Sequence, residues 1–210
     1  MEKKDESRRL ERRTMGVREL RADGESGKIE GYASVFNEET DLGYFREVVR
    51  PGAFKRAINE GQDVRALWNH DPNYVLGRTT SGTLELAEDR HGLKITIDPP
   101  DTQFARDLVK SIERGDVDQM SFAFVATEEA WTERKDETDL RELIDVDLYD
   151  VSPVTYPAYE GTSVGLRSAE AIYNDHVESL GAQVLTDDDD ADDRAQVLAD
   201  AQRRVNLVKL

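Results

Sequence analysis

Between Ile29 and Val154, the chain repeats one pattern: a short run of alternating apolar and polar residues, then a cluster of turn-forming residues. Three such runs, YVLGR, GTLELAE and GLKITID, are separated by the turn sequences TTSG and EDRHG. A period of two places alternate side chains on one face of a β-strand, and Gly, Ser and Asp favour turns. Strands joined by short turns pair antiparallel, because a parallel pair needs a long crossover. The pattern therefore predicts a mainly antiparallel β-barrel that is closed or nearly closed.

A few helices are expected among these strands. One lies in RPGAFKRAINEG, residues 50–61, where Pro51 suits the first turn and Gly61 the end. A second lies in DTQFARDLVKSIERG, residues 101–115, and its apolar face contains Phe104, Ala105, Leu108, Val109 and Ile112. Residues 128–154 are predicted to form a hairpin with RKDETD as its exposed turn. Many antiparallel strands with a few surrounding helices indicate the α+β class.

The two ends of the chain differ from this central part. Residues 1–27 are very polar, and we interpret them as a flexible or weakly helical arm. Residues 169–180 predict a helix with one apolar stripe, and the acidic segment TDDDDADD follows it. The last segment, RAQVLADAQRRVNLVKL, predicts a second, weakly amphipathic helix. We therefore expect residues 28–168 to be the main domain and residues 169–210 to be an assembly or docking element.

Composition argues against several classes of function. The formal net charge is −17, which disfavours nucleic-acid binding. The chain has no cysteine, so disulfides, thiolate metal sites and cysteine nucleophiles are excluded. No metal-binding histidine pair and no phosphate-binding glycine loop occurs, so no metal or cofactor is expected. No apolar run approaches the roughly 18 residues of a membrane helix, and the charged N-terminus lacks the apolar core of a secretory signal. We expect an intracellular protein without a membrane or nucleic-acid partner.

Ser121 lies in DVDQMSFAFVATEEA, in a run that predicts a buried strand. Such a hydroxyl is either a packing group or a nucleophile, and no glycine-flanked nucleophile elbow surrounds it. A nucleophilic serine needs a histidine base. His70 ends an alternating strand and precedes the turn starter DPN, whereas His91 lies in a turn and His176 lies on an apolar helical stripe. Both interpretations of Ser121 stay open at this point.

Asp150 is a carboxylate at the end of an apolar strand face. In the strand LRELIDVDLYDVSPV, alternation places on one side Leu140, Ile144, Val146, Leu148 and Asp150, with Glu142 as a polar exception. Asp145 and Asp147 fall on the other side. A carboxylate in that place is costly to bury unless it is paired. Asp150 is therefore either a strand end turned to solvent or a group that orients His70.

Seven segments occur in this order: GYASVFN, VVRPGAFKRAI, ALWNHD, LGRTTSGTLEL, DRHGLKITID, QMSFAFV and LYDVSPVTYPAY. Together they resemble the prohead maturation serine proteases of tailed bacteriophages, which are related in fold to the herpesvirus assemblins. The resemblance covers about residues 28–168. It implies an assemblin-like fold in which the nucleophile is displayed from a barrel strand.

By position, the resemblance implies that Ser121 is the nucleophile and that His70 is the general base and then acid. Asp150 stands where the family commonly has a glutamate, and it would orient His70. His91 is a lower-ranked alternative for that third role. Arg141 and Arg78 are candidates for stabilising an oxyanion, and a surface or strand-end role is the alternative for each.

The resemblance also implies a function: an endopeptidase that digests capsid scaffolding segments during procapsid maturation of a phage or prophage. The expected partners are the major capsid protein or a separate scaffold, with self-cleavage and a homo-oligomer as further expectations. The expected location is the interior of the procapsid in the bacterial host cytoplasm. Two rival classes remain, a non-enzymatic capsid assembly factor and a small-molecule esterase. A Ser121–His70 distance beyond about 8 Å would favour the assembly factor, because a competent pair lies within about 2.6–3.2 Å.

Overall fold

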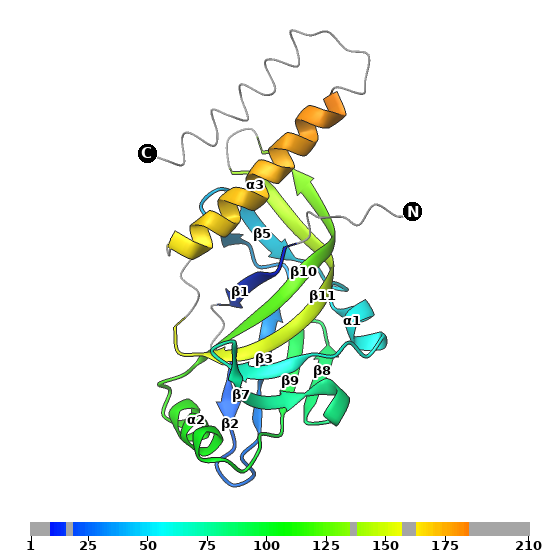
Figure 1. Ribbon diagram of the computed structural model, residues 1–210. Coiled ribbons are helices and arrows are strands. Elements are labelled where there is room, and N and C mark those ends of the chain that lie inside the picture. Colours follow the sequence, from blue (N-terminus) through cyan, green and yellow to red (C-terminus); the bar gives the residue numbers. More distant parts are fainter. Residues whose placement is uncertain (1–8, 16–18, 135–137, 157–162, 185–210) are drawn as a thin grey trace. The chain divides into compact units, whose positions relative to one another are not determined.

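The computed structural model describes residues 9–15, 19–134, 138–156 and 163–184 (Figure 1). Of their side chains, those of residues 15, 163–167 and 181–184 are not described. The chain divides into two compact units. Unit 1 comprises Met1–Glu39, Val48–Trp131 and Arg141–Ala158, and unit 2 comprises Thr40–Glu47, Thr132–Leu140 and Tyr159–Leu210. All residues of the expected site lie in unit 1.

One sheet of unit 1 is a four-stranded antiparallel sheet with the order β2-β3-β9-β8. Its strands are β2 (Arg21–Ala22), β3 (Ile29–Val35), β8 (Leu84–Glu88) and β9 (Gly92–Ile97). The turn between β8 and β9 contains the predicted turn sequence, and Asp89 Oδ1 accepts the backbone N–H groups of His91 and Gly92. An Asx residue that bonds its own following backbone is a common way to make such a turn.

The second sheet has seven strands with the order β1-β10-β11-β5-β4, and β6 joins β11 to β7. Its strands are β1 (Glu11–Met15), β4 (Thr40–Asp41), β5 (Arg46–Val49), β6 (Arg65–Trp68), β7 (Asp71–Arg78), β10 (Gln119–Thr132) and β11 (Leu140–Val154). β10 and β11 are the two long arms of the predicted hairpin (Figure 1). β6 and β11 pair in parallel, with Asp150 opposite Arg65.

The structure is α+β and mostly strand, as predicted, but the barrel is not confirmed. In the described residues, the two sheets have open strand orders, and no ladder joins their ends into a ring. Periodicity identifies a segment as extended because it depends on neighbouring residues alone. Closure depends on which distant edges pair, and no local pattern in the sequence encodes that.

The two α-helices that the structure describes in unit 1 are close to their predicted places, and unit 1 also contains a 3₁₀ helix where a turn was predicted. These helices are α1 (Lys55–Asn59), the short 3₁₀ helix η1 (Thr79–Ser81) and α2 (Gln103–Glu113). α1 begins four residues after Pro51, and turns occupy residues 51–54. There the Glu88 carboxylate, from β8, accepts the backbone N–H groups of Gly52 (2.7 Å) and Phe54 (3.2 Å). A distant strand thus satisfies these donors. Gly52 has a φ of 107°, which is not helical, so the helix begins after it.

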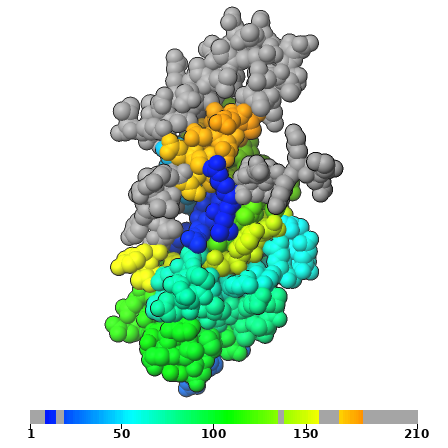
Figure 2. Space-filling model, in the orientation of Figure 1, coloured from blue at the N-terminus to red at the C-terminus, as the bar shows by residue number. Residues whose placement is uncertain are grey.

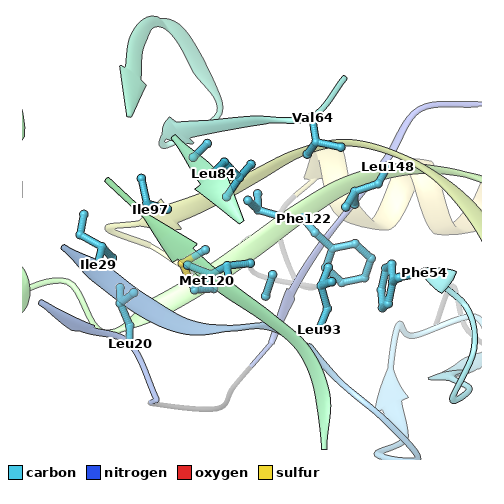
Figure 3. Packing of buried hydrophobic residues seen from close by; sticks show 14 of the residues in the cluster. Leu20, Ile29, Phe54, Val64, Leu84, Leu93, Ile97, Met120, Phe122 and Leu148 are labelled. Atoms are coloured by element: carbon cyan, nitrogen blue, oxygen red, sulfur yellow. The ribbon is translucent and has the colours of Figure 1, made fainter. Parts of the chain in front are cut away.

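The core of unit 1 packs around the aromatic residues of β10 (Figure 3). Phe122 is fully buried between Phe54, whose ring meets it edge-on at 5.6 Å between centroids, and Phe124, stacked at 5.0 Å. Met120 is also buried. The predicted face of α2 is buried too, through Ala105, Leu108, Val109 and Ile112. Dense packing restricts the movement of β10, which carries Ser121.

The N-terminal segment is not a flexible or weakly helical arm throughout, because it contributes β1 and β2. β1 pairs antiparallel with β10, from Glu11 opposite Phe124 to Met15 opposite Met120. The polar sequence of this segment did not predict a strand, because the strand is stabilised by pairing with β10 and by ion pairs. Strand propensity depends on such context more than on the residues themselves.

Unit 2 contains β4, the start of β5 and the helix α3 (Ser163–Val184). The predicted stripe of α3 is buried at Ala169, Ile172 and Tyr173. Tyr173 stacks on Phe45 and donates its hydroxyl to Asp139 Oδ2 at 2.8 Å. The acidic segment and the second predicted helix lie outside the described residues. Among the residues that are described, no helix is long and apolar enough to cross a membrane.

Candidate active site

His70 lies in the two-residue turn that joins β6 to β7, where Trp68 stands opposite Asp71. Asn69 and His70 both have φ of 57°, in the left-handed region. A tight hairpin turn of this kind needs positive φ at both central residues, and Asn tolerates it better than His does. Holding a non-glycine residue there costs on the order of 1–3 kcal/mol. The surrounding structure must therefore hold His70 in place.

Residues after Val151 hold this turn. The Asn69 backbone N–H donates to the Pro153 carbonyl at 3.0 Å. The Asn69 side chain accepts the Thr155 N–H at 2.8 Å and donates to the Thr155 hydroxyl at 3.2 Å. Three hydrogen bonds thus attach the turn to the end of the strand that carries Asp150 and to the residue that follows this strand.

Asp150 receives two hydrogen bonds on one oxygen. Oδ1 lies 2.6 Å from His70 Nδ1 and 2.7 Å from the Ser152 hydroxyl. The His70 and Asp150 side chains are only 10% and 12% exposed. Since Nδ1 faces a carboxylate, it carries the proton, and Nε2 presents a lone pair.

Ser121 lies on the other side of His70. Its Oγ is 2.7 Å from His70 Nε2, and the residue is fully buried on β10. Ser121 follows His70 by 51 positions in the sequence, and Asp150 follows it by 80. In the fold the three residues form one line of contacts, Ser121 Oγ–His70–Asp150. In this arrangement the imidazole can take the serine proton while the carboxylate steadies the resulting charge.

A family model described as caudovirus prohead serine protease matches residues 13–175, which is more than half of the chain. The chain belongs to this family. The match begins within β1 and extends into α3.

The prohead protease of Enterobacteria phage HK97 is similar in sequence, with 31% identity over 154 residues. The aligned part covers 71% of this chain and 64% of that protein, so the chain spans less than two thirds of its relative's length. A solved structure, the bacteriophage T4 capsid assembly protease gp21, has a TM-score of 0.43 and 12% sequence identity. That comparison covers 70% of this chain and 98% of the T4 chain.

Within this prohead protease fold, the Ser121 hydroxyl has a second acceptor. It lies 2.9 Å from the backbone carbonyl of Arg13 in β1. A hydroxyl has one proton, so it donates either to His70 or to Arg13 at a given moment. Sequence reasoning missed this contact because the N-terminal segment was not expected to form a strand.

The two arginines named as oxyanion candidates are both engaged by carboxylates. Arg78 makes two parallel hydrogen bonds of 2.6 Å to Asp63, and both residues are substantially exposed. Arg141 is 2% exposed, so a surface role for it is wrong. Its Nη1 and Nη2 contact Glu11 at 2.7 and 2.8 Å, and it also pairs with Glu129.

The other two histidines are elsewhere. His91 packs edge-on against Tyr32 and lies 3.3 Å from Glu19, with a side chain that is 43% exposed. His176 belongs to α3 in unit 2, near Tyr173. Asp150, and not His91, is therefore the group that contacts His70 Nδ1.

Two supporting residues were missed although the sequence carried a signal for each. Ser152 is two residues after Asp150, so it shares a strand face with it. Asn69 precedes His70 and is the residue type most compatible with a left-handed turn after glycine. Alternation along β11 also changes phase, since Leu143 is buried and Ile144 is 36% exposed. Asp145 and Asp147 lie on the other face, as predicted, where both bind Arg56.

Proposed function

We propose that this protein is a serine endopeptidase that cleaves scaffolding segments of a phage capsid protein, or a separate scaffold, during procapsid maturation. The observation that carries the proposal is the line of short contacts from Ser121 Oγ through His70 to Asp150. Membership of the prohead protease family supports the same reaction class.

In the proposed mechanism, Ser121 Oγ attacks the scissile carbonyl carbon as its proton passes to His70 Nε2. The carbonyl oxygen becomes an oxyanion, which backbone amides or a cation would stabilise. His70 then gives the proton to the leaving amine, so the peptide C–N bond breaks and an acyl-Ser121 ester remains. Water, deprotonated by His70, hydrolyses the ester and restores the serine.

Asp150 and Ser152 act through His70 in this scheme. The Asp150 carboxylate keeps the proton on Nδ1 and faces the imidazolium that forms during the reaction. The Ser152 hydroxyl fixes the same carboxylate oxygen. Neither group touches the substrate, so both are positioning residues.

The partners follow from this function. The substrate would be the major capsid protein or its scaffold, and the protease would also cut itself and work as a homo-oligomer. The enzyme would act inside the procapsid, in the bacterial host cytoplasm. Residues 28–168 would be the protease domain, and residues 169–210 would direct it to the capsid or be removed by self-processing.

Co-expression with the cognate capsid protein tests the proposal. We expect wild type to trim the capsid protein and Ser121→Ala to leave it intact. Ser34→Ala is the matched control, because Ser34 is also a fully buried strand serine and its hydroxyl has no hydrogen-bond partner among the described residues. Trimming by the Ser121→Ala variant at the wild-type rate would contradict the proposal and favour a non-enzymatic assembly factor. Turnover of small esters without trimming would favour an esterase.

A further inference from the structure

β1 lies along one edge of β10 (Figure 1), and it pairs with the part of β10 that contains Ser121. Five residues of β1 pair antiparallel with β10, and Thr14 stands directly opposite Ser121. The other neighbour of β10 is β11, so β10 would be an edge strand if β1 left. A free edge beside a nucleophile is a place where an extended peptide can add as a strand.

The contact at Ser121 gives the register of this strand. The carbonyl that accepts the Ser121 hydroxyl is that of Arg13. A peptide bound in the same register presents its own carbonyl at the same place. The residue two positions earlier then occupies the place of Glu11, because strand residues i and i−2 share a face.

Glu11 is held by a charged pair that is almost completely buried. Glu11 is 4% exposed and Arg141 is 2% exposed, and both carboxylate oxygens meet the guanidinium in a fork. Arg13 also donates to Glu11 at 2.6 Å, and its guanidinium lies 5.5 Å from the centre of the Phe124 ring. Burial by itself raises the pKa of Glu11, but the charges of Arg13 and Arg141 lower it overall, which keeps the carboxylate ionised. An arginine fork of this kind selects a planar carboxylate.

The side chains of β1 that the structure describes, at residues 11–14, are all polar. Arg12 is exposed and Leu10, just before the strand, is 53% exposed. Part of β1 is visible at the surface in dark blue (Figure 2). The ladder to β10 and the Glu11–Arg141 pair attach β1 through its backbone and one carboxylate, and another strand with the same groups can make both contacts.

We propose that a substrate peptide binds as a strand along the edge of β10 that β1 covers, next to Ser121. β1 then occupies this site as a pseudosubstrate. Arg141 is the specificity residue, and it binds an acidic side chain two residues before the carbonyl that faces Ser121. This inference rests on the proposed function, since it names the peptide class that the protease accepts. While β1 is in place, the Arg13 carbonyl competes with His70 for the Ser121 proton and the enzyme is held at low activity.

Peptide binding tests the site without requiring activity. The probe is a fluorescent peptide of residues 9–18, RLERRTMGVR, and its control has Gln in place of the glutamate. In the protein used, the recognition sequence of a site-specific protease replaces residues 16–18. The protein folds with β1 attached, the site-specific protease then cuts after β1, and the released N-terminal peptide is removed. We expect saturable binding of the Glu peptide and at least tenfold weaker binding of the Gln peptide. Equal affinity of the two peptides, or no binding of either, would overturn the inference.

The reactivity of Ser121 tests the same site in the full chain. We expect a fluorophosphonate to label Glu11→Gln at least fivefold faster than wild type, and the control Arg12→Ala at the wild-type rate. Addition of the Glu peptide should slow the labelling of the cut protein again. Equal labelling of wild type and Glu11→Gln, both folded by circular dichroism, would contradict the role of β1. If Glu11→Gln does not fold, the labelling rate of the cut protein, with and without the Glu peptide, tests the role of β1 instead.

The two proposals fail in different ways. If no form of the protein is labelled or trims capsid protein, the serine protease function is wrong. The peptide-binding ratio then still decides whether Arg141 and β10 form an acidic-peptide site. If labelling at Ser121 and trimming occur but the Glu and Gln peptides bind equally, only the inference is wrong.

Discussion

At the residue scale, Asp150 Oδ1 accepts from both His70 and Ser152 and is nearly buried. This arrangement makes the tautomer of His70 depend on one carboxylate oxygen. Replacing Asp150 by Asn keeps the shape, but its amide can donate to Nδ1 and stabilise the wrong tautomer. We expect Asp150→Asn to lower kcat on the order of 10³-fold or more with KM little changed. Steady-state kinetics on a capsid-derived peptide measure this, and a loss below about tenfold would argue against the orienting role.

The hydrogen bond from Ser152 to Asp150 Oδ1 allows a second test of the role of this carboxylate. Losing a hydrogen bond to a charged group costs about 1.5–3 kcal/mol, or roughly a tenfold or greater loss when it acts on the rate. We therefore expect Ser152→Ala to lower kcat by about tenfold without raising KM, and Ser152→Thr to restore most of it. The Ser34→Ala variant is again the control. An unchanged kcat in Ser152→Ala would mean that the hydroxyl only fills space.

At the element scale, an ion pair between Glu11 of β1 and Arg141 of β11 holds β1 in place, and acid should weaken it. Because the pKa of Glu11 in the folded protein lies below its usual value of 4.5, the pair stabilises β1 fully above that pH. Its contribution is lost as pH falls through the folded-state pKa. We expect hydrogen exchange in β1, corrected for intrinsic rates, to accelerate on acidification more in wild type than in Glu11→Gln. Parallel pH dependence of the two proteins would show that this carboxylate does not hold the strand.

Gly92 sets the close approach of β9 to β3. A Cβ placed there would lie 2.0 Å from the Ser34 carbonyl oxygen. Because this oxygen belongs to the backbone of β3, it can move only if the strand itself moves. We expect Gly92→Ala to lower the free energy of unfolding by about 1–3 kcal/mol, the usual cost of overpacking. The exposed residue Lys94, on the same strand, supplies the control Lys94→Ala. Urea denaturation would contradict the prediction if both variants had equal midpoints.

Particular residues explain how far the sequence predicted these elements. Strands and helices with clear periodicity, such as β8, β9 and α2, were found because their patterns are local. His70, Ser121 and Asp150 were named, and the structure brings them together. β1 was missed because its stability comes from Arg141, 130 positions away from Glu11. α1 begins later than predicted because Gly52 adopts a φ of 107°, which no local pattern indicates. Barrel closure also depends on non-local pairing.

At the scale of the whole molecule, Ser121, His70 and Asp150 belong to unit 1, whereas α3 and the C-terminal residues belong to unit 2. If residues 185–210, the part of the C-terminal segment beyond α3, direct the enzyme to the capsid, their removal should abolish packaging and leave peptide cleavage intact. We expect a chain that ends at residue 184 to cleave peptides within about twofold of the wild-type rate and to be absent from purified procapsids. Quantitative immunoblotting of procapsids checks this. Packaging of the shortened chain at wild-type levels would contradict the targeting role.

The spacing of the site residues also has a consequence for synthesis. His70 and Ser121 are made before Asp150, and the turn that carries His70 is attached to Pro153 and Thr155. Contacts between residues this far apart in sequence form late in folding, because loop closure must precede them. A nascent chain shorter than about residue 155 therefore has no assembled proton relay. The contacts of Ser121, His70 and Asp150 can therefore form only once nearly all of unit 1 has been translated.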